Sequence, residues 1–328
     1  MPKHRFDQHE HFDQTEVQAA CAFMAKQGVE FKEDAGLWTA KQLDYVRAQV
    51  YESKPQTLGG LALVPPSSDA PEWAETISSV SYDSVGMAKI VANYADDLPR
   101  ADVKGVERIV KVHTVGDSYG YNVQELRVSA AMGTQLPTRK ADAARRAVDL
   151  KLNRISLVGD ADYGIYGITN HPNMPVVSGL NGDWADPATT AEQIVADFDT
   201  MVQAVRTQSK GVHYPNKAAV ASSAWAAAES KVLTGNAGKS AADRIREKYP
   251  RIAIVDMPEL DASVADGIAD NMIIVGEFTT ENVVNDVPMQ FNQLPAQARN
   301  LEFVVPCMAR AAGVSLFYPL AFAKATGL

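Results

Sequence analysis

The string GDSYG, at residues 116–120, fits the G-x-S-x-G pattern that places a nucleophilic serine on a sharp turn. His171, His213 and several aspartates follow it in the chain order of a serine hydrolase. Such a turn requires a buried apolar strand before the serine and a helix directly after it. The preceding VERIVKVHT is half polar, and the following YNVQ keeps an extended character. The context therefore favours a glycine-bounded turn at the base of a β-arm, and a hydrolase stays as an alternative.

A second string, LTGNAGKS at residues 233–240, invites comparison with a phosphate-binding loop. That loop has four residues between its first glycine and its Gly-Lys pair, whereas Gly235 leaves only two. The preceding AWAAAESKVL is typical of a helix rather than of an apolar strand. We therefore expect a glycine turn, followed by a helix with Ser240 as its N-cap and Asp243 at the third following position.

A metal site and an acid–base pair are the other chemistry that residue types suggest. The polar leader HRFDQHEHFD holds five side chains that could gather a metal: His4, His9, His11, Asp7 and Asp13. Histidines two residues apart share a face only in an extended strand, and so polar a leader offers no scaffold to orient ligands. Two acid pairs lie in turn-rich stretches, Asp96 with Asp97 and Asp160 with Asp162. Aspartate is favoured there for backbone reasons, so we predict no catalytic residue, no metal site and no cofactor.

Composition describes a globular chain that can bury a sizeable core. Of its 328 residues, 46% are hydrophobic and 22% are charged, which suits one large or two modest domains. The chain has no run of eighteen apolar residues and its N-terminus is polar, so we expect neither a membrane span nor a signal peptide. We expect Cys21 and Cys307 to be free thiols. A net charge of −9 repels phosphate backbones, which disfavours tight nucleic-acid binding but permits enclosure of DNA without attachment.

Two segments near the N-terminus cannot build cores of their own. Residues 1–35 are too polar to do so, which predicts an arm laid along another surface, with a partner subunit as the simplest candidate. ISSVSYDSVGMAKIVANY and VERIVKVHTV are rich in β-favouring residues and flank the charged connector ADDLPRADVKG. We interpret residues 74–123 as a long β-arm held by something outside its domain. Both features favour a protein that assembles.

The stretch TRKADAARRAVDLKLNRISLVG predicts an amphipathic helix about 20 residues or 30 Å long, which could act as a strut. Thr138 is its predicted N-cap and Gly159 its stop. Its core-facing stripe includes four side chains: Ala144, Val148, Leu152 and Ile155. Gly164 and Gly167 follow among apolar residues, so that the chain could turn back beside the helix without obstruction.

This helix, its closing glycine and the following GIYGITNHPN resemble the major capsid proteins of tailed bacteriophages. The C-terminal FVVPCMARAAGVSLFYPLAFAKATGL resembles the returning strands of that family, with Arg310, Gly313, Pro319 and Ala321 in the matching places. The likeness spans the order of elements from about Glu125 onward, although only these two stretches are specific in sequence. The segments before Glu125 match in kind and order rather than in residues.

The resemblance implies an α+β fold with an N-terminal arm, an extended β-loop, a peripheral domain around the long spine helix, and an axial domain with a mixed sheet. Mapped onto this chain, the arm is residues 1–35 and the loop residues 74–123. The peripheral domain combines residues 36–73, 124–175 and 301–328, and residues 176–300 form the axial domain. The last range suits that role, because it shows a capped helical pattern followed by short apolar strands.

The resemblance also implies a function: a major capsid protein that self-assembles into the icosahedral head shell around a phage double-stranded DNA genome. Its partners would be copies of itself, in hexamers and pentamers, together with portal, scaffolding and cement proteins. The enclosed DNA would be held without sequence-specific binding, and no membrane would be involved. Such a protein acts in the virion, is assembled in the host bacterial cytoplasm, and is not an enzyme. The main alternative is an encapsulin-like cargo compartment on the same shell fold.

The tip of the β-arm supplies the hypothesis for contacts between subunits. Five charged residues lie there: Asp96, Asp97, Arg100, Asp102 and Lys104. A hairpin with so many charges at its end gains nothing from a core of its own, and exposed ion pairs are individually weak. A closed shell repeats each contact many times, so small interactions between subunits would add up.

Overall fold

The computed structural model divides the chain into two compact units, Met1–Gln56 and Thr57–Leu328. The structure describes the second unit apart from residues 86–101, 126, 128–135, 235–237 and 265–266. The predicted N-terminal arm, with its histidine-rich leader and Cys21, therefore lies outside the described residues. Cys307 is within them, and it is a buried free thiol, as predicted.

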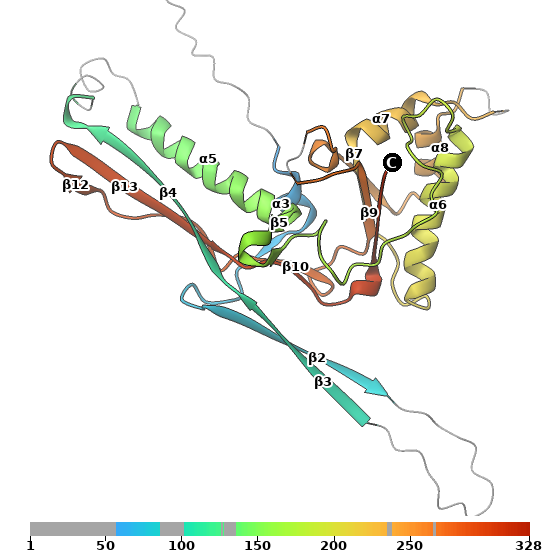
Figure 1. Ribbon diagram of the computed structural model, residues 1–328, viewed down its shortest axis with the longest axis horizontal. Coiled ribbons are helices and arrows are strands. Elements are labelled where there is room, and N and C mark those ends of the chain that lie inside the picture. Colours follow the sequence, from blue (N-terminus) through green and yellow to red (C-terminus); the bar gives the residue numbers. More distant parts are fainter. Residues whose placement is uncertain (1–56, 86–101, 126, 128–135, 235–237, 265–266) are drawn as a thin grey trace, which may run out of the picture. The chain divides into compact units, whose positions relative to one another are not determined.

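Helices and strands are mixed along the described part, which confirms the predicted α+β class (Figure 1). The helices include α3 Gly59–Leu63, α5 Leu136–Leu157, α6 Ala191–Gln208, α7 Ser222–Ser230 and α8 Ala241–Lys248, with short 3-10 turns η2 Ala161–Tyr163, η3 Pro258–Leu260 and η4 Pro319–Ala321. The strands include β1 Pro66–Ser67, β2 Thr76–Val85, β3 Asp102–Lys111, β4 His113–Asn122, β5 Gly159–Asp160, β6 Ile165–Tyr166, β7 Lys217–Ala221, β8 Ala253–Met257, β9 Met272–Gly276, β10 Val283–Asp286, β11 Met289–Gln293, β12 Gln297–Arg299, β13 Glu302–Ala311, β14 Gly313–Leu316 and β15 Phe322–Thr326.

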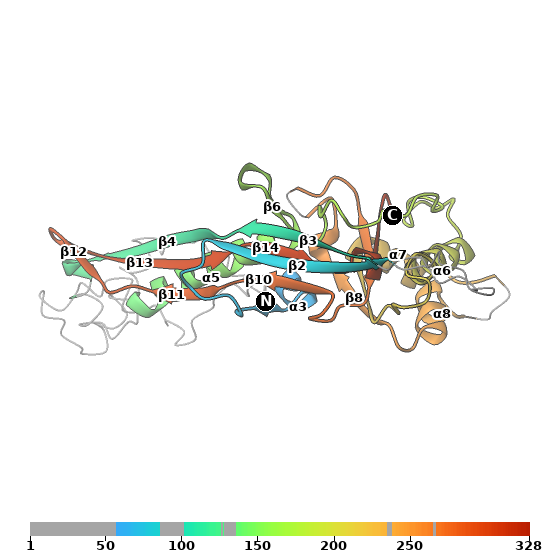
Figure 2. The same cartoon turned by 90° about the horizontal axis from the view of Figure 1, so that it is seen from below.

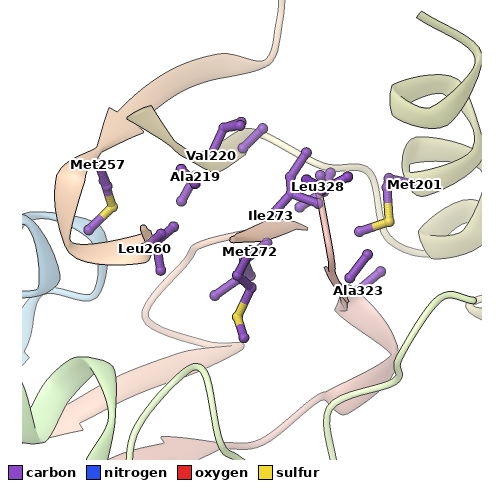
Figure 3. Close-up of a cluster of buried hydrophobic side chains, with 14 of the residues drawn as sticks. Met201, Ala219, Val220, Met257, Leu260, Met272, Ile273, Ala323 and Leu328 are labelled. Atoms are coloured by element: carbon purple, nitrogen blue, oxygen red, sulfur yellow. The ribbon is translucent and has the colours of Figure 1, made fainter. Parts of the chain in front are cut away.

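The larger hydrophobic core surrounds a four-stranded sheet in the order β15-β9-β7-β8. Strand β7 is parallel to β8 and antiparallel to β9, while β15 is antiparallel to β9. All five residues of β9 are buried, as expected for an apolar strand that is covered on both faces. Figure 3 shows Met201 of α6 pointing toward Ala323 of β15, and Met257 and Leu260 at the other side of the cluster. The sequence predicted these strands as short apolar runs, and the structure confirms them.

Two helices of this part begin with capping boxes, which is why their starts could be located from the sequence. Thr190 accepts a hydrogen bond from the Gln193 amide, and the Gln193 side chain accepts one from the Thr190 amide, at the start of α6. Ser240 and Asp243 make the same reciprocal pair at the start of α8. The predicted N-cap at Ser240 is therefore confirmed, and each box satisfies two backbone amides that helix geometry leaves free.

A second core lies under the long helix α5, where its apolar stripe meets β13 and the segment after β10 (Figure 1). Strand β13 pairs along its whole length with β4, from Glu302 opposite Asn122 to Ala311 opposite His113. Strands β11 and β12 pair with β13 on its other edge. This sheet supports α5 along its length, so the helix does not depend on its own propensity for stability.

The predicted β-arm is present in part, as the antiparallel pair β2–β3 (Figure 2). Its register runs from Thr76 opposite Lys111 to Val85 opposite Asp102. Strand β4 belongs to the range that the sequence assigned to the arm, yet it leaves the pair at Val112 and joins β13 instead. Residues 113–122 of the predicted loop therefore lie in the sheet under α5.

Two local predictions from the sequence are wrong. The string GDSYG is not a turn, because residues 113–122 form one continuous strand with Ser118 opposite Pro306. Pairing with a distant strand stabilises extended backbone across both glycines of the string. Thr138 is not an N-cap, because α5 already includes Leu136 and Pro137. Proline is tolerated in a first helical turn, where its missing amide would have had no partner.

Candidate functional site

The root of the β2–β3 pair is held to the body of the unit by buried and polar contacts. Ala74 and Val112 are buried there, and the Val112 amide donates to the Glu75 carbonyl at 2.9 Å. Arg108 Nη1 of β3 donates to the Leu316 carbonyl of β14, also at 2.9 Å. Because Arg108 carries a positive charge, this hydrogen bond is stronger than a neutral one. The direction in which the pair starts is thus fixed by the fold.

Beyond this root, the pair presents apolar side chains to solvent. Val80 is 53% exposed and Ile109 is 63% exposed, and the register places both on one face with Ser78 and Glu107. A two-stranded sheet is marginally stable in water without a surface to pack on. Trp73, beside the root, is 81% exposed. This face therefore has the character of a surface that is covered when the protein assembles.

The predicted contact residues at the tip of the arm are only partly visible. Asp96, Asp97 and Arg100 lie outside the described residues. The backbone of Asp102 and Lys104 belongs to β3, opposite Val85 and Asp83, and their side chains are not described. Their role in contacts between subunits stays a prediction.

The predicted apolar stripe of the long helix is buried against the sheet. Ala144 is 5% exposed, Val148 1%, Leu152 4% and Ile155 2%. The last three pack with β6, β13 and Val287 in one cluster. Exposed residues such as Leu150 occupy the other side of the helix. The helix therefore has one face fixed by its own subunit and one face free to meet another surface.

The C-terminal end of α5 joins two other elements through a buried polar contact. Asn153 Nδ2 donates to Glu259 Oε1 at 2.5 Å, and Asn153 Oδ1 accepts from the Leu61 amide at 3.1 Å. Burial raises the pKa of Glu259. A Cβ at Gly59 would lie 2.4 Å from Glu259 Oε2, so a larger residue there would have to move the Glu259 side chain. The joint connects α5 with α3 and η3, at the point where the described chain begins.

The chain after α5 turns back beside the helix, as the glycine spacing predicted. Gly159 has a φ of 73°, and a Cβ there would lie 2.2 Å from the Ile165 carbonyl oxygen. A Cβ at Gly167 would lie 2.3 Å from the Leu157 carbonyl oxygen. Backbone meets backbone at both positions, which only glycine permits.

A cavity of about 510 Å³ lies between β4, α5 and the segment that follows α5. Lys151 Nζ and Asp160 Oδ2 form an ion pair of 2.8 Å at its wall, and the Lys151 hydrogen bond lowers the pKa of Asp160. The rings of His113 and Tyr163 lie 5.4 Å apart on the same wall. The sequence predicted that Asp160 has no catalytic role. Its carboxylate is engaged by Lys151, which would have to move away before Asp160 could act as a general acid or base.

The model of the major capsid protein family matches residues 86–328, which is most of the chain. The chain belongs to the major capsid protein family. A comparison with curated proteins found no match. As a member of this family, the capsid protein is a component of the head shell and acts in the virion.

Solved structures share the fold of this capsid protein at low sequence identity. The capsid of Myoviridae phage XM1 matches with a TM-score of 0.76 and 14% identity, over 90% of this chain and 100% of that one. A chain from Mycobacterium phage Adephagia matches with a TM-score of 0.59 and 12% identity, over 97% of this chain and 98% of that one. The capsid of a native GTA particle matches with a TM-score of 0.60 and 12% identity, over 90% and 99%. The predicted tailed-phage capsid fold is confirmed.

Within the described residues, the structure does not arrange the serine and the histidines of the hydrolase alternative as a catalytic site. Ser118 lies on β4 opposite Pro306. His171 is buried, packs on Tyr166 and accepts from the Asn173 amide, and burial lowers its pKa to about 4. The other histidine of that alternative has its own partner, because His213 Nδ1 lies 2.7 Å from Glu277 Oε2. Ser118 is exposed on its strand, whereas the two histidines contact residues other than the serine.

The other motifs considered in the sequence form no reactive centre in the part of the capsid protein that the structure describes. Ser240 caps α8, while residues 235–237 of the predicted glycine turn lie outside the description. Among the described residues, no three histidines, cysteines or acids gather as metal ligands. No helix in the same residues has the length and apolar character needed to cross a membrane.

Sequence reasoning missed the side chains that hold the shell elements to one another. Arg108 and Leu316 are 208 positions apart, and Asn153 and Glu259 are 106 apart. Arg310 was noted for its place in the C-terminal stretch, but its hydrogen bond to the Glu72 carbonyl was not foreseen. In the sequence, these contacts are indicated only by a charged or amide side chain that stands inside an apolar run.

Proposed function

We propose that this capsid protein self-assembles as hexamers and pentamers into a closed icosahedral head shell that encloses a phage double-stranded DNA genome. The observation that carries the proposal is the β2–β3 pair, rooted at Arg108 while Val80 and Ile109 are exposed. A fixed root and an uncovered apolar face suit an element that packs on a neighbouring copy. The net charge of −9 suits an inner surface over which packaged DNA can move rather than adhere.

The domain plan of the proposal follows the predicted ranges except where the strand pairing departs from them. Residues 1–35 serve as the arm, and residues 74–112 as the extended loop. Residues 176–282 form the axial domain together with residues 322–328, because β15 pairs with β9. Residues 36–73, 113–175 and 283–321 form the peripheral domain around α5, because β4, β11 and β12 pair with β13 and β10 pairs with β14.

The finer partners and setting belong to the same proposal. Portal, scaffolding and cement proteins complete the head, which is assembled in the host bacterial cytoplasm. The protein has no enzymatic activity, and the cargo-compartment alternative is not favoured, since the family match and the phage capsid structures agree.

Sedimentation velocity of the purified full-length protein tests the proposal. The expected result is a population of capsomers and of very large particles, whose balance shifts with protein concentration and salt. A single small species over the whole concentration range would contradict it.

A further inference from the structure

An exposed cluster of apolar side chains lies at the C-terminal end of α6, outside the elements discussed above. It comprises Val212, Tyr214, Phe317, Tyr318 and Leu320, which we call the aromatic cluster. Val212 is 73% exposed and Tyr318 is 54% exposed. Side chains of this kind seldom gather on the surface of a protein that remains alone. The cluster therefore needs an explanation beyond the fold of the single chain.

The two loops that carry the aromatic cluster are tied together. Gln208 Nε2 donates to the Leu320 and Phe322 carbonyls at 3.1 and 2.8 Å. The ring of His213 lies 5.6 Å from that of Tyr318, and His213 Nδ1 lies 2.7 Å from Glu277 Oε2. Because the loops are held before any partner arrives, little conformational entropy would be lost on binding. Tyrosines presented in this way are typical anchors of protein interfaces.

The exposed charges on the α6 side of the cluster are positive within the described residues. The Arg206 guanidinium lies 5.4 Å from the centre of the Tyr214 ring, and Lys210 is exposed beside it. The carboxylate of Glu277 is already engaged by His213 and by Asn282. Glu281 is exposed in the loop whose Asn282 carbonyl accepts from the Phe317 and Tyr318 amides, so the basic character is confined to the α6 side of the cluster. A basic patch on a chain of net charge −9 indicates an acidic counterpart for that side.

The opposite end of the same helix offers that counterpart. Asp183, Asp186 and Glu192 are exposed around the N-terminal end of α6, and Val232 nearby is 57% exposed. Lys231 Nζ donates to the Asp186 and Thr189 carbonyls and so fixes the loop that carries these groups. The 18 residues of α6 place the two ends about 27 Å apart at 1.5 Å per residue. One copy therefore cannot bring its own two ends together.

We propose that the aromatic cluster of one copy docks on the acidic N-terminal end of α6 in the next copy. The occupant is a second copy of this chain, chosen by charge complementarity and by the fixed spacing of the two ends. The contact is head-to-tail, with each copy contributing one half to each neighbour, and such contacts close into rings when the rotation between copies allows. This inference rests on the proposed shell function and names a contact within it.

Charge reversal with rescue tests the contact. The variant Arg206→Glu with Lys210→Glu should keep the wild-type thermal transition of the unassembled protein and reduce the yield of large particles at least about tenfold, which corresponds to about 1.4 kcal/mol. Adding Asp183→Lys and Asp186→Lys to the same chain should restore assembly, since every interface then pairs opposite charges again. Gln203→Glu, on the exposed middle of α6, is the matched control and should assemble normally.

A second variant covers the case in which the rescue chain fails to fold. Val212→Ser with Leu320→Ser changes no charge and keeps the contact between His213 and Tyr318, and it should also prevent large particles while leaving the thermal transition unchanged. Normal assembly of either double variant would overturn the inference. Absence of large particles from the wild-type protein would instead count against the proposed shell function, so the two failures are distinguishable.

Discussion

At the scale of single residues, backbone crowding decides how the chain leaves α5. Gly159 and Gly164 both have positive φ angles, 73° and 68°, but their surroundings differ. A Cβ at Gly159 would meet backbone at 2.2 Å, whereas nothing lies within 4 Å of a Cβ at Gly164. The left-handed conformation alone costs a non-glycine residue about 1–2 kcal/mol. Substitution at Gly164 therefore tests conformational strain alone, whereas substitution at Gly159 adds a steric collision.

We predict that Gly164→Ala lowers the free energy of unfolding by about 1 kcal/mol, whereas Gly159→Ala lowers it by several times as much. The reason is that the Ile165 carbonyl cannot move without breaking the β5–β6 pair. Chemical denaturation of the two purified variants provides the measurement. Equal losses at the two positions would show that the close approach has no energetic role.

Burial of the helix stripe gives a second prediction at this scale. Val148→Asp should cost several kcal/mol and yield insoluble protein, since Val148 is 1% exposed and packs in an apolar cluster. Leu150→Asp, on the exposed side of the same helix, is the control and should remain soluble. Soluble yields and thermal transitions decide the matter, and a normal yield of Val148→Asp would contradict the packing described for α5.

His171 gives a pH-dependent prediction. Burial, followed by the charges of Arg108 and Lys324, lowers its pKa from 6.5 to about 4. Between these values the unfolded chain binds a proton that the folded protein does not, so stability falls as pH decreases, at up to about 1.4 kcal/mol per unit. His171→Gln should flatten this part of the stability curve relative to wild type. Urea unfolding at pH 7, 5.5 and 4.5 measures the difference, and parallel curves would refute it.

At the scale of elements, sequence patterns located those whose signals are local. Capping boxes gave the starts of α6 and α8, and a continuous apolar run gave β9. Strand β4 was mistaken for a turn and for part of the arm, because its partner β13 lies about 190 positions away and its glycines are typical of turns. Long-range pairing overrides such local preferences, and no single-sequence pattern reports it.

The β2–β3 pair carries the prediction at this scale. Changing Asp96, Asp97 and Asp102 together to Lys should leave the thermal transition of the unassembled protein close to wild type. Particle formation should be blocked or become strongly dependent on salt, because weak ion pairs are repeated at every interface of a shell. Sedimentation at low and high salt makes the measurement. Normal shells under both conditions would show that the charged tip makes no contact that assembly requires.

At the scale of the whole molecule, the features that define a shell protein are those that a single copy leaves incomplete. The β2–β3 pair exposes Val80 and Ile109, and the aromatic cluster exposes Tyr318 at a rigid end of α6. The cores around β9 and under α5 are complete in one copy, which accounts for a stable subunit. The sequence could indicate assembly from polarity and strand composition. It could not show which side chains stay exposed, since that depends on long-range contacts within the subunit such as Arg108 with Leu316.

Electron cryomicroscopy of particles formed by the full-length protein tests the central claim most directly. The account predicts closed icosahedral shells in which the β2–β3 pair of each copy packs its Val80 and Ile109 face on a neighbouring copy. Small oligomers without closed shells, or shells in which that face remains exposed to solvent, would contradict it.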